Sequence, residues 1–205
     1  MSIHLLVPFY RKHLYKTLTY YYGQMKILFH PICDSVDIEP FKDNKLDWVK
    51  PLLCPSLIPG QQCYKKFNDF IDLGEIILDD YYGFCGDDDM FEPEFFSELS
   101  KRNSDVVYNS NYRGDKIPND GAPHGVSPLI IRRKEDVFVN NIGLGMFFVK
   151  GHIFKTTRFD INFSGADGRF AEDVLHKGTI DFMSNSFVFG NYFQPGRHTD
   201  RNKFL

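Results

Sequence analysis

The chain has 205 residues, the length of one domain, and its 42% hydrophobic and 25% charged residues are typical of a globular protein. The formal net charge of −3, with scattered basic residues, excludes the basic footprint of a nucleic-acid-binding protein. The four cysteines form no CxxC pair, and the first apolar run has about seven residues, far below the roughly 20 of a membrane helix. We therefore expect a cytoplasmic protein with reduced thiols and no integral membrane segment, either free in solution or bound peripherally to a membrane through partners.

The beginning of the chain predicts a strand, a helix and a second strand. Residues 3–9 form a continuous apolar run, which is typical of a strand buried on both faces. Residues 11–23 place leucine and tyrosine side chains on one helical stripe, and Gly23 can end that helix. Residues 26–33 predict the second strand, which should run parallel to the first because such crossovers are right-handed.

The next segment predicts a long connection followed by a helix and a strand. Residues 35–60 hold several prolines and predict a loop with one short element near Trp48. Residues 61–74 carry an apolar helical stripe, and residues 81–86 predict a short strand. Pro93 favours the first turn of a further helix.

The second half predicts a strand at residues 105–112 and a glycine- and proline-rich loop at residues 113–128. Further strands are expected at residues 129–133, 146–150 and 180–193, a helix at 169–178, and an irregular polar tail from residue 194. The whole chain therefore predicts an α/β protein with one central sheet, parallel in its first half and mixed later, flanked by helices.

An acidic triplet, Asp87, Asp88 and Asp89, follows the predicted strand at residues 81–86. Ligands of open α/β sheets bind beyond the carboxyl ends of the strands. Asp87 and Asp89 alternate along the chain and can point the same way, and two such oxygens with waters and phosphates are typical ligands of Mg²⁺ or Mn²⁺. The alternative is a solvated turn whose aspartates cap the next helix.

Two further groups carry candidate chemistry. Glu172 and Asp173 lie early in the predicted helix at residues 169–178, where a carboxylate can act as a general base, or can simply favour the helix N-terminus. His198 in the polar tail can bind a metal. The alternative for the tail is a solvated C-terminus.

The order of these motifs resembles the GT-A class of nucleotide-sugar glycosyltransferases, most of all the large family-2 type. The matching stretches are LLVPFYR (5–11), ICDS (32–35), GDDDMFEPEFF (86–96), IGLGMFFVKGHIF (142–154) and GADGRFAEDVL (165–175). The resemblance implies a GT-A (Rossmann-like) fold in a single domain, residues 1–205. Residues 1–112 would form the nucleotide-sugar-binding half, and residues 113–205 the acceptor-binding and catalytic half.

The resemblance also implies roles for individual residues. The residues that would bind the nucleotide are Pro8, Phe9, Tyr10, Arg11, Asp34, Asp87 and Asp88. The metal ligands would be Asp87, Asp89 and His198. The catalytic base would be Asp173, with Glu172 beside it. The segment 143–146 would lie beside the acceptor and the donor sugar. The sequence departs from the family pattern at Arg11, where the family usually has Asn, and at Asp34, which is a single acidic residue rather than a pair. The chain also ends soon after His198.

On this resemblance we expect a metal-dependent glycosyltransferase of the hexosyltransferase type. It would use Mn²⁺ or Mg²⁺ and move a sugar from a nucleotide diphosphate sugar, with a UDP-sugar as the expected donor, to a hydroxyl of a glycan or other acceptor. Inversion at the sugar is favoured because Asp173 supplies a base, and retention stays open.

Two alternatives belong to other classes. A nucleotidyltransferase that makes sugar nucleotides would also need a strand-end aspartate and a metal. Such enzymes usually open with a glycine-rich loop and a basic residue that hold a triphosphate, and residues 5–15 contain no glycine. A non-catalytic sugar- or nucleotide-binding module on the same fold would bind ligand without turnover.

Overall fold

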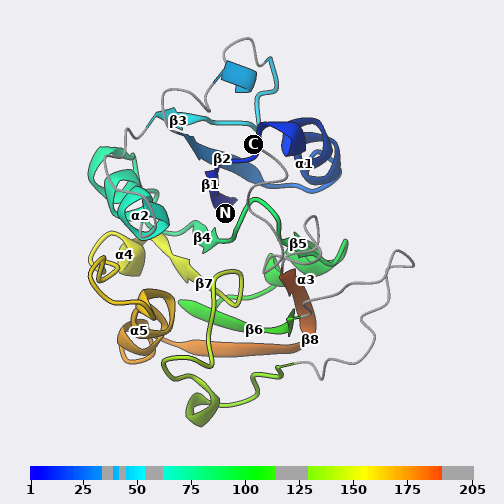
Figure 1. Ribbon diagram of the computed structural model, residues 1–205. Coiled ribbons are helices and arrows are strands. Elements are labelled where there is room, and N and C mark those ends of the chain that lie inside the picture. Colours follow the sequence, from blue (N-terminus) through cyan, green and yellow to red (C-terminus); the bar gives the residue numbers. More distant parts are fainter. Residues whose placement is uncertain (34–38, 42–44, 54–61, 114–128, 191–205) are drawn as a thin grey trace.

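The computed structural model describes residues 1–33, 39–41, 45–53, 62–113 and 129–190. Within these ranges the backbone forms one sheet of eight strands in the order β3-β2-β1-β4-β7-β6-β8-β5 (Figure 1). The strands are β1 (Ile3–Phe9), β2 (Leu28–Cys33), β3 (Leu52–Leu53), β4 (Tyr81–Phe84), β5 (Met90–Phe91), β6 (Val106–Arg113), β7 (Phe147–Lys150) and β8 (Ile180–Gly190).

The strand directions bring most carboxyl ends to one edge of the sheet. Strands β1, β2, β3 and β4 are mutually parallel, and β6 is parallel to β8. Only β7 and β5 run in the opposite direction among the described strands, since β7 pairs antiparallel with both β4 and β6, and β5 with β8. The carboxyl ends of β1, β4, β6 and β8 therefore share one edge, which is where ligands of α/β sheets bind.

Helices cover both faces of the sheet (Figure 1). The α-helices are α1 (Tyr15–Tyr22), α2 (Gln62–Leu73), α3 (Phe95–Leu99), α4 (Gly151–Phe154) and α5 (Ala166–Val174), and short 3-10 turns are η1 (Lys12–Leu14), η2 (Glu39–Phe41) and η3 (Lys134–Asp136). Helices α2, α4 and α5 lie on one face, and α1 and α3 lie on the other. None of the described helices has the length and apolar character that crossing a bilayer requires.

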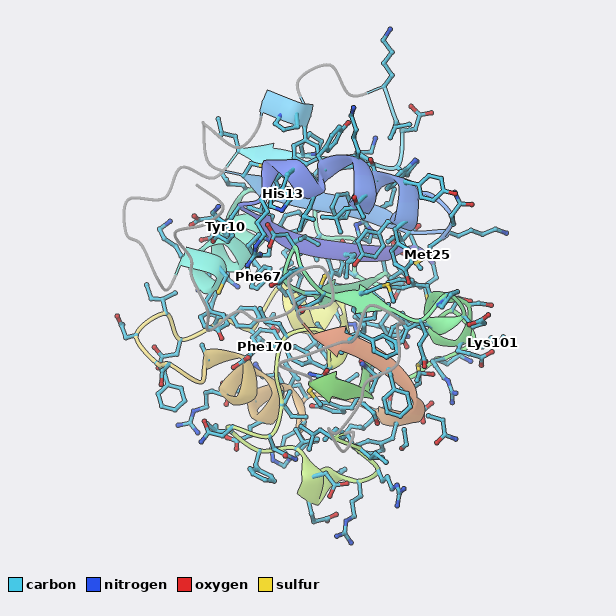
Figure 2. The ribbon with its side chains drawn as sticks, turned by 45° about the vertical axis from the view of Figure 1, so that its right-hand side comes forward. Tyr10, His13, Met25, Phe67, Lys101 and Phe170 are labelled. Atoms are coloured by element: carbon cyan, nitrogen blue, oxygen red, sulfur yellow. The ribbon has the colours of Figure 1, made fainter. Side chains whose placement is uncertain are left out.

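A cluster of phenylalanines joins the sheet to α2, α4 and α5. The ring of Phe84 on β4 lies 4.9 to 5.7 Å, between ring centroids, from the rings of Phe67, Phe154, Phe159 and Phe170. Figure 2 labels Phe67 and Phe170, which lie one above the other on this side of the sheet. Aromatic pairs at these separations contribute about 0.5–1.5 kcal/mol each beyond their buried area. The carboxyl end of β4, and hence the acidic triplet, is anchored to a densely packed layer.

The predicted fold class is confirmed: the protein is α/β, with a sheet that is parallel in its first half and mixed later. The strand expected at residues 129–133 is wrong. Only Leu129 forms a β-bridge, with Asn111, and the chain then turns because the Asp136 carboxylate accepts the backbone N–H groups of Arg132 and Arg133. Strand β5 and helix α4 were not predicted, since neither spans more than four residues.

The helix expected at residues 169–178 begins earlier and ends earlier, as α5 at residues 166–174. Its first turn includes a glycine, and the backbone N–H of Arg169 already donates to the carbonyl of Gly165 at 2.9 Å. Parts of the expected loops, and the polar tail, lie outside the described residues. The division into two functional halves stays a prediction.

At the opposite, amino-terminal edge of the sheet lies a buried polar network. His4 Nδ1 lies 2.9 Å from His30 Nε2, and His4 Nε2 lies 3.1 Å from Asp80 Oδ2. Burial, with a smaller contribution from neighbouring His4, lowers the pKa of His30 from 6.5 to about 3. Burial also lowers the pKa of His4, although Asp80 opposes that shift. Both imidazoles are therefore neutral in the folded chain at physiological pH.

This network makes stability depend on pH. Between pH 6.5 and about 3 the unfolded chain protonates His30 and the folded chain does not. The unfolded state then binds more protons, so the free energy of unfolding should fall as pH drops, by up to about 1.4 kcal/mol per pH unit for such a group. We expect His30→Gln to flatten this dependence between pH 6.5 and 4.5 in urea unfolding. The matched control is His176→Gln, at an exposed histidine outside this network, and slopes that are equal for the wild type and His30→Gln would contradict the prediction.

Candidate functional site

Asp87 joins the end of β1 to the end of β4. Its side chain is 1% exposed. One carboxylate oxygen, Oδ2, accepts the backbone N–H groups of Tyr10 at 2.8 Å and Arg11 at 2.9 Å, and the other, Oδ1, contacts Nη1 of Arg11. Hydrogen bonds to a charged acceptor are stronger than neutral ones. Asp87 therefore fixes the conformation of the turn that follows β1.

Asp88 and Asp87 together orient the guanidinium group of Arg11. Nη2 of Arg11 lies 3.2 Å from Oδ2 of Asp88, an ion-pair distance without the alignment of a hydrogen bond. Asp88 is buried, whereas 20% of the Arg11 side chain is exposed. The pair of aspartates thus presents a cation, partly open to solvent, at the shared carboxyl edge of β1 and β4.

Asp89 closes the turn after β4. Its Oδ2 accepts the backbone N–H of Gly86 at 2.7 Å, and its backbone carbonyl accepts the hydroxyl of Tyr22 at 3.3 Å. A Cβ at residue 86 would lie 2.8 Å from Oδ1 of Asp88 and 3.1 Å from Oδ2 of Asp89, so any larger residue would displace these carboxylates. The triplet is thus largely buried, and no side-chain hydrogen bond caps the start of α3, so the solvated helix cap is not what the structure shows.

Tyr10 provides an aromatic surface beside Arg11. Pro8 and Phe9 are buried within β1, whereas Tyr10 is 39% exposed. Nζ of Lys66, a buried residue of α2, lies 4.2 Å from the centre of the Tyr10 ring and 3.4 Å from the carbonyl oxygen of Ile32. Figure 2 shows Tyr10 on the same side of the molecule as α2. Of the three residues expected to line a nucleoside site, only Tyr10 has an accessible ring.

The sequence reasoning missed two asparagines on β6. Asn109 and Asn111 are buried and lie on the same face of the strand near its carboxyl end, and Nδ2 of Asn109 donates to the carbonyl of Gly145 at 2.8 Å. Neither Oδ1 atom has a hydrogen-bond partner among the described residues. Buried polar atoms without partners are uncommon. The only sequence signal was the alternation Asn-Ser-Asn at a strand end.

The contacts of Glu172, one of the two catalytic candidates of α5, lie within α5 and the segment before it. Oε1 of Glu172 accepts the backbone N–H of Val139 at 2.8 Å, and Oε2 lies 3.5 Å from Arg169. Asp173 is exposed. The acidic residue of α5 closest to the expected donor segment is Asp167, whose Oδ2 would lie 3.8 Å from a Cβ on Gly143. The roles of Glu172 and Asp173 stay predictions, and Asp34 and His198 lie outside the described residues.

The expected Mn²⁺ or Mg²⁺ can be tested against these contacts. Both oxygens of Asp87 already accept N–H donors, so a metal held by Asp87 and Asp89 would share the Asp87 carboxylate with Arg11 and the turn after β1. No group of three or more His, Cys, Asp or Glu that could hold a metal occurs among the described residues. Oδ1 of Asp89 and the amide oxygen of Asn111 are oxygen ligands of the type that Mg²⁺ and Mn²⁺ prefer. The metal roles of Asp87, Asp89 and His198 stay predictions.

No protein-family model matches the chain, and no curated protein matches its sequence. Solved structures do match its fold. The inositol-1-phosphate CTP transferase from T. maritima aligns with a TM-score of 0.50 and 10% identity, over 93% of this chain and 89% of that chain. A protein from Bacillus anthracis, named as a glucose-1-phosphate thymidylyltransferase, aligns with a TM-score of 0.51 and 10% identity, over 92% and 89%. At this identity the likeness shows the fold alone.

These neighbours correct the expected enzyme class. Both are named for transfer of a nucleotidyl group rather than a hexosyl group. The expectation of a hexosyltransferase is therefore wrong. The resemblance identified the GT-A-like arrangement of the sheet. It did not separate the two classes of transferase, because a strand-end aspartate is expected in both.

We expect Asp87→Ala to destabilise the fold by about 3 kcal/mol, because two backbone N–H groups lose their acceptor and Arg11 loses its buried partner. Urea unfolding measures this change. The matched control is Asp79→Ala, at an exposed aspartate near the same strand, which should change stability by less than about 0.5 kcal/mol. Equal stabilities of the two variants would show that Asp87 does not hold the turn.

Proposed function

We propose that this protein is a nucleotidyltransferase that joins the nucleotidyl group of a nucleoside triphosphate to the phosphate of a phosphorylated sugar or polyol. The observation that carries the proposal is the Arg11 guanidinium, held by Asp87 and Asp88 at the carboxyl ends of β1 and β4. The substrate class is that of the two structural neighbours, which are named for inositol 1-phosphate and glucose 1-phosphate.

Arg11 supplies the basic residue that such an enzyme needs. A guanidinium group matches the geometry of phosphate oxygens and always carries its charge. The first turn contains no glycine, and its backbone N–H groups at Tyr10 and Arg11 already donate to Asp87. A glycine-rich loop holds phosphate through backbone N–H groups of this kind. Because these N–H groups are occupied here, the side chain of Arg11 would bind the phosphate instead.

Tyr10, in the same turn, would bind the base of the nucleotide. Its ring is partly exposed and lies next to the buried ammonium of Lys66. Aromatic rings stack on nucleic acid bases, and base stacking of this kind is worth about 1–3 kcal/mol. Tyr10 would contact the base while Arg11 contacts the phosphates, since the two residues are adjacent.

The reaction needs no general base from α5. An oxygen of the sugar phosphate forms a bond to the α-phosphorus of the triphosphate, and the bond from that phosphorus to the bridging oxygen breaks, releasing pyrophosphate. A phosphate monoester with a second pKa of about 6 is already anionic at neutral pH. This agrees with the exposed position of Asp173 and with the structural hydrogen bond of Glu172.

The protein's part in this chemistry is to bind and orient charge. Negative charge develops on the leaving pyrophosphate, and a fixed cation such as Arg11 stabilises it without reorganisation. A bound Mn²⁺ or Mg²⁺ would add Lewis-acid stabilisation of the same charge. Asp87 and Asp88 keep Arg11 in place through both the ground state and the transition state.

Pyrophosphate release tests the proposal. The full chain is incubated with Mg²⁺, with glucose 1-phosphate or inositol 1-phosphate, and with each of CTP, dTTP, UTP and GTP in turn. We expect release with one sugar phosphate and a preferred nucleotide, and a loss of about 10²–10³ in rate for Arg11→Met. Arg11→Lys keeps a positive charge beside Asp87 but lacks the planar guanidinium group, so its rate should lie between those of the wild type and Arg11→Met.

The matched control is Arg158→Gln, which removes another arginine, one that pairs with the exposed Asp72 away from the acidic triplet. Its rate should equal that of the wild type. Thermal unfolding with each nucleotide detects binding without turnover, because ligand at 100 times its dissociation constant stabilises the fold by about 2.7 kcal/mol. Stabilisation without pyrophosphate release would indicate a binding module and would overturn the proposed activity.

A further inference from the structure

The outer side of β8 is an open strand edge over most of its length. Strand β8 pairs with β6 on one side, and on the other side β5 covers only Val188 and Phe189. Among the described residues, no strand pairs with the outer side of residues 180–186. Figure 1 shows β8 beside β6, on the side away from β7. An open edge of this kind presents backbone N–H and C=O groups that can pair with another chain.

The pairing with β6 shows which residues of β8 present these groups outward. The carbonyl of Thr179 accepts the N–H of Val106, on β6, at 3.0 Å. Because the hydrogen-bonding groups of successive residues face alternate sides of a strand, Ile180 and Phe182 direct theirs away from β6. The N–H of Phe182 already donates to Oδ1 of Asp181 at 2.7 Å. The edge therefore offers mainly acceptors, two carbonyls at the alternate spacing of a β-ladder.

An irregularity in the pairing of β6 with β8 opens a groove beside this edge. Asn109 pairs with Met183, whereas the next residue, Ser110, pairs with Phe187, so residues 184–186 have no strand partner on β6. Such a bulge bends its strand and interrupts the ladder. Residues 184–186 and side chains on and next to α3 line a groove of about 510 Å³. Since ligand sites commonly measure roughly 300–1,000 Å³, the groove has room for side chains of a bound peptide.

The groove has acidic walls. Four ionisable side chains line it, three carboxylates and one guanidinium: Glu92, Glu94, Glu98 and Arg102. The guanidinium of Arg102 is already paired, since its Nη1 donates to Oδ2 of Asp181 at 2.9 Å. Glu98 pairs with Lys101, but Glu94 is exposed and has no ion-pair partner within the described ranges. The groove therefore carries negative charge that the described part of the chain does not balance.

Glu92 and Glu94 affect each other's charge. Burial raises the pKa of Glu92, and the nearby carboxylate of Glu94 raises it further, against a hydrogen bond from the backbone N–H of Phe187. That hydrogen bond, 2.9 Å long, fixes Glu92 at the wall of the groove. Because like charges disfavour each other's ionisation, a positive side chain bound between the two carboxylates would be attracted by both.

We propose that the outer edge of β8 and this groove bind an extended, basic segment of a partner protein, which adds to the sheet as a further strand. Backbone N–H groups of the segment would donate to the carbonyls of Ile180 and Phe182. Its lysine or arginine side chains would reach Glu92 and Glu94. In binding by strand addition the main chain supplies affinity, and pockets for alternate side chains supply specificity.

A second copy of this chain fits the edge less well than a basic segment does. A two-fold axis brings the same surface of both copies together, so the glutamates of the two grooves would face each other. Like charges placed opposite each other oppose such a contact. The proposal does not rest on nucleotidyl transfer, since neither Arg11 nor Asp87 lines the groove.

Peptide binding to the full chain tests the proposal. Residues 180–186 span roughly 23 Å at about 3.3 Å per residue, so a peptide of six residues matches the open edge. The probes are a fluorescent peptide of alternating lysine and valine, its counterpart of alternating glutamate and valine, and the basic peptide with every backbone amide N-methylated. We expect binding of the basic peptide that weakens with added salt, no binding of the acidic one, and a loss of at least about tenfold on N-methylation.

A charge reversal in the groove locates the binding. Glu94→Lys should weaken binding of the basic peptide at least about tenfold, because it replaces an attraction by a repulsion. The variant should stay folded, since the Glu94 side chain makes no capping hydrogen bond to α3. The matched control is Asp47→Lys, the same change of charge at an exposed residue before β3, which is the other end of the sheet. Its affinity should equal that of the wild type.

Several results would overturn the proposal. They are no binding of the basic peptide at millimolar concentrations, equal binding of the basic and acidic peptides, unchanged binding after N-methylation, or equal affinities of Glu94→Lys and Asp47→Lys. Dimers of the wild type in sedimentation, without peptide binding, would assign the edge to a second copy and would also overturn it. Peptide binding that follows the expected pattern in a protein that releases no pyrophosphate would support this proposal and contradict only the nucleotidyltransferase.

Discussion

The architecture of the candidate site depends on the carboxylate of Asp87, which accepts the backbone N–H groups of two consecutive residues and contacts the Arg11 guanidinium. This contact joins the ends of two neighbouring parallel strands, so that the first turn of the chain and the acidic triplet form one unit. A buried carboxylate is costly unless it is paired and hydrogen-bonded. Here both conditions are met, and the same contacts that satisfy Asp87 orient the cation of the site.

The antiparallel strand β7 determines which residues lie beside the first turn and the acidic triplet. Because β7 runs against its neighbours β4 and β6, β6 returns to the direction of β4, and its carboxyl end reaches the same edge. The chain after the triplet then crosses to β8 as β5. These two connections bring Asn111 of β6 and Gly190 of β8 beside Asp89, which lies in the turn between β4 and β5. The site is thus assembled by strand order rather than by any continuous motif.

The two edges of the sheet differ in their polar chemistry. At the amino-terminal edge, His4, His30 and Asp80 satisfy one another in a closed network, stacked against aromatic rings. At the carboxyl edge, oxygens of Asp88, Asn109 and Asn111 have no hydrogen-bond partner among the described residues. A satisfied network stabilises a fold, whereas buried acceptors without hydrogen-bond partners are uncommon in native structures.

The sequence by itself determined the fold class, the parallel strands of the first half, most helix positions and the placement of an acidic triplet at a strand end. These follow from local patterns, since apolar periodicity and turn residues act over a few positions. It did not determine what the aspartates contact, because Arg11 and Asp87 are 76 residues apart and only strand pairing joins them. Nor did it identify Asn111, which lies near Asp89 only because β6, β8 and the turn after β4 meet at one edge of the sheet. Strand order is a property of the whole sheet, and so the tertiary structure alone decided that Asp87 binds an arginine while Asp89 faces β6 and β8.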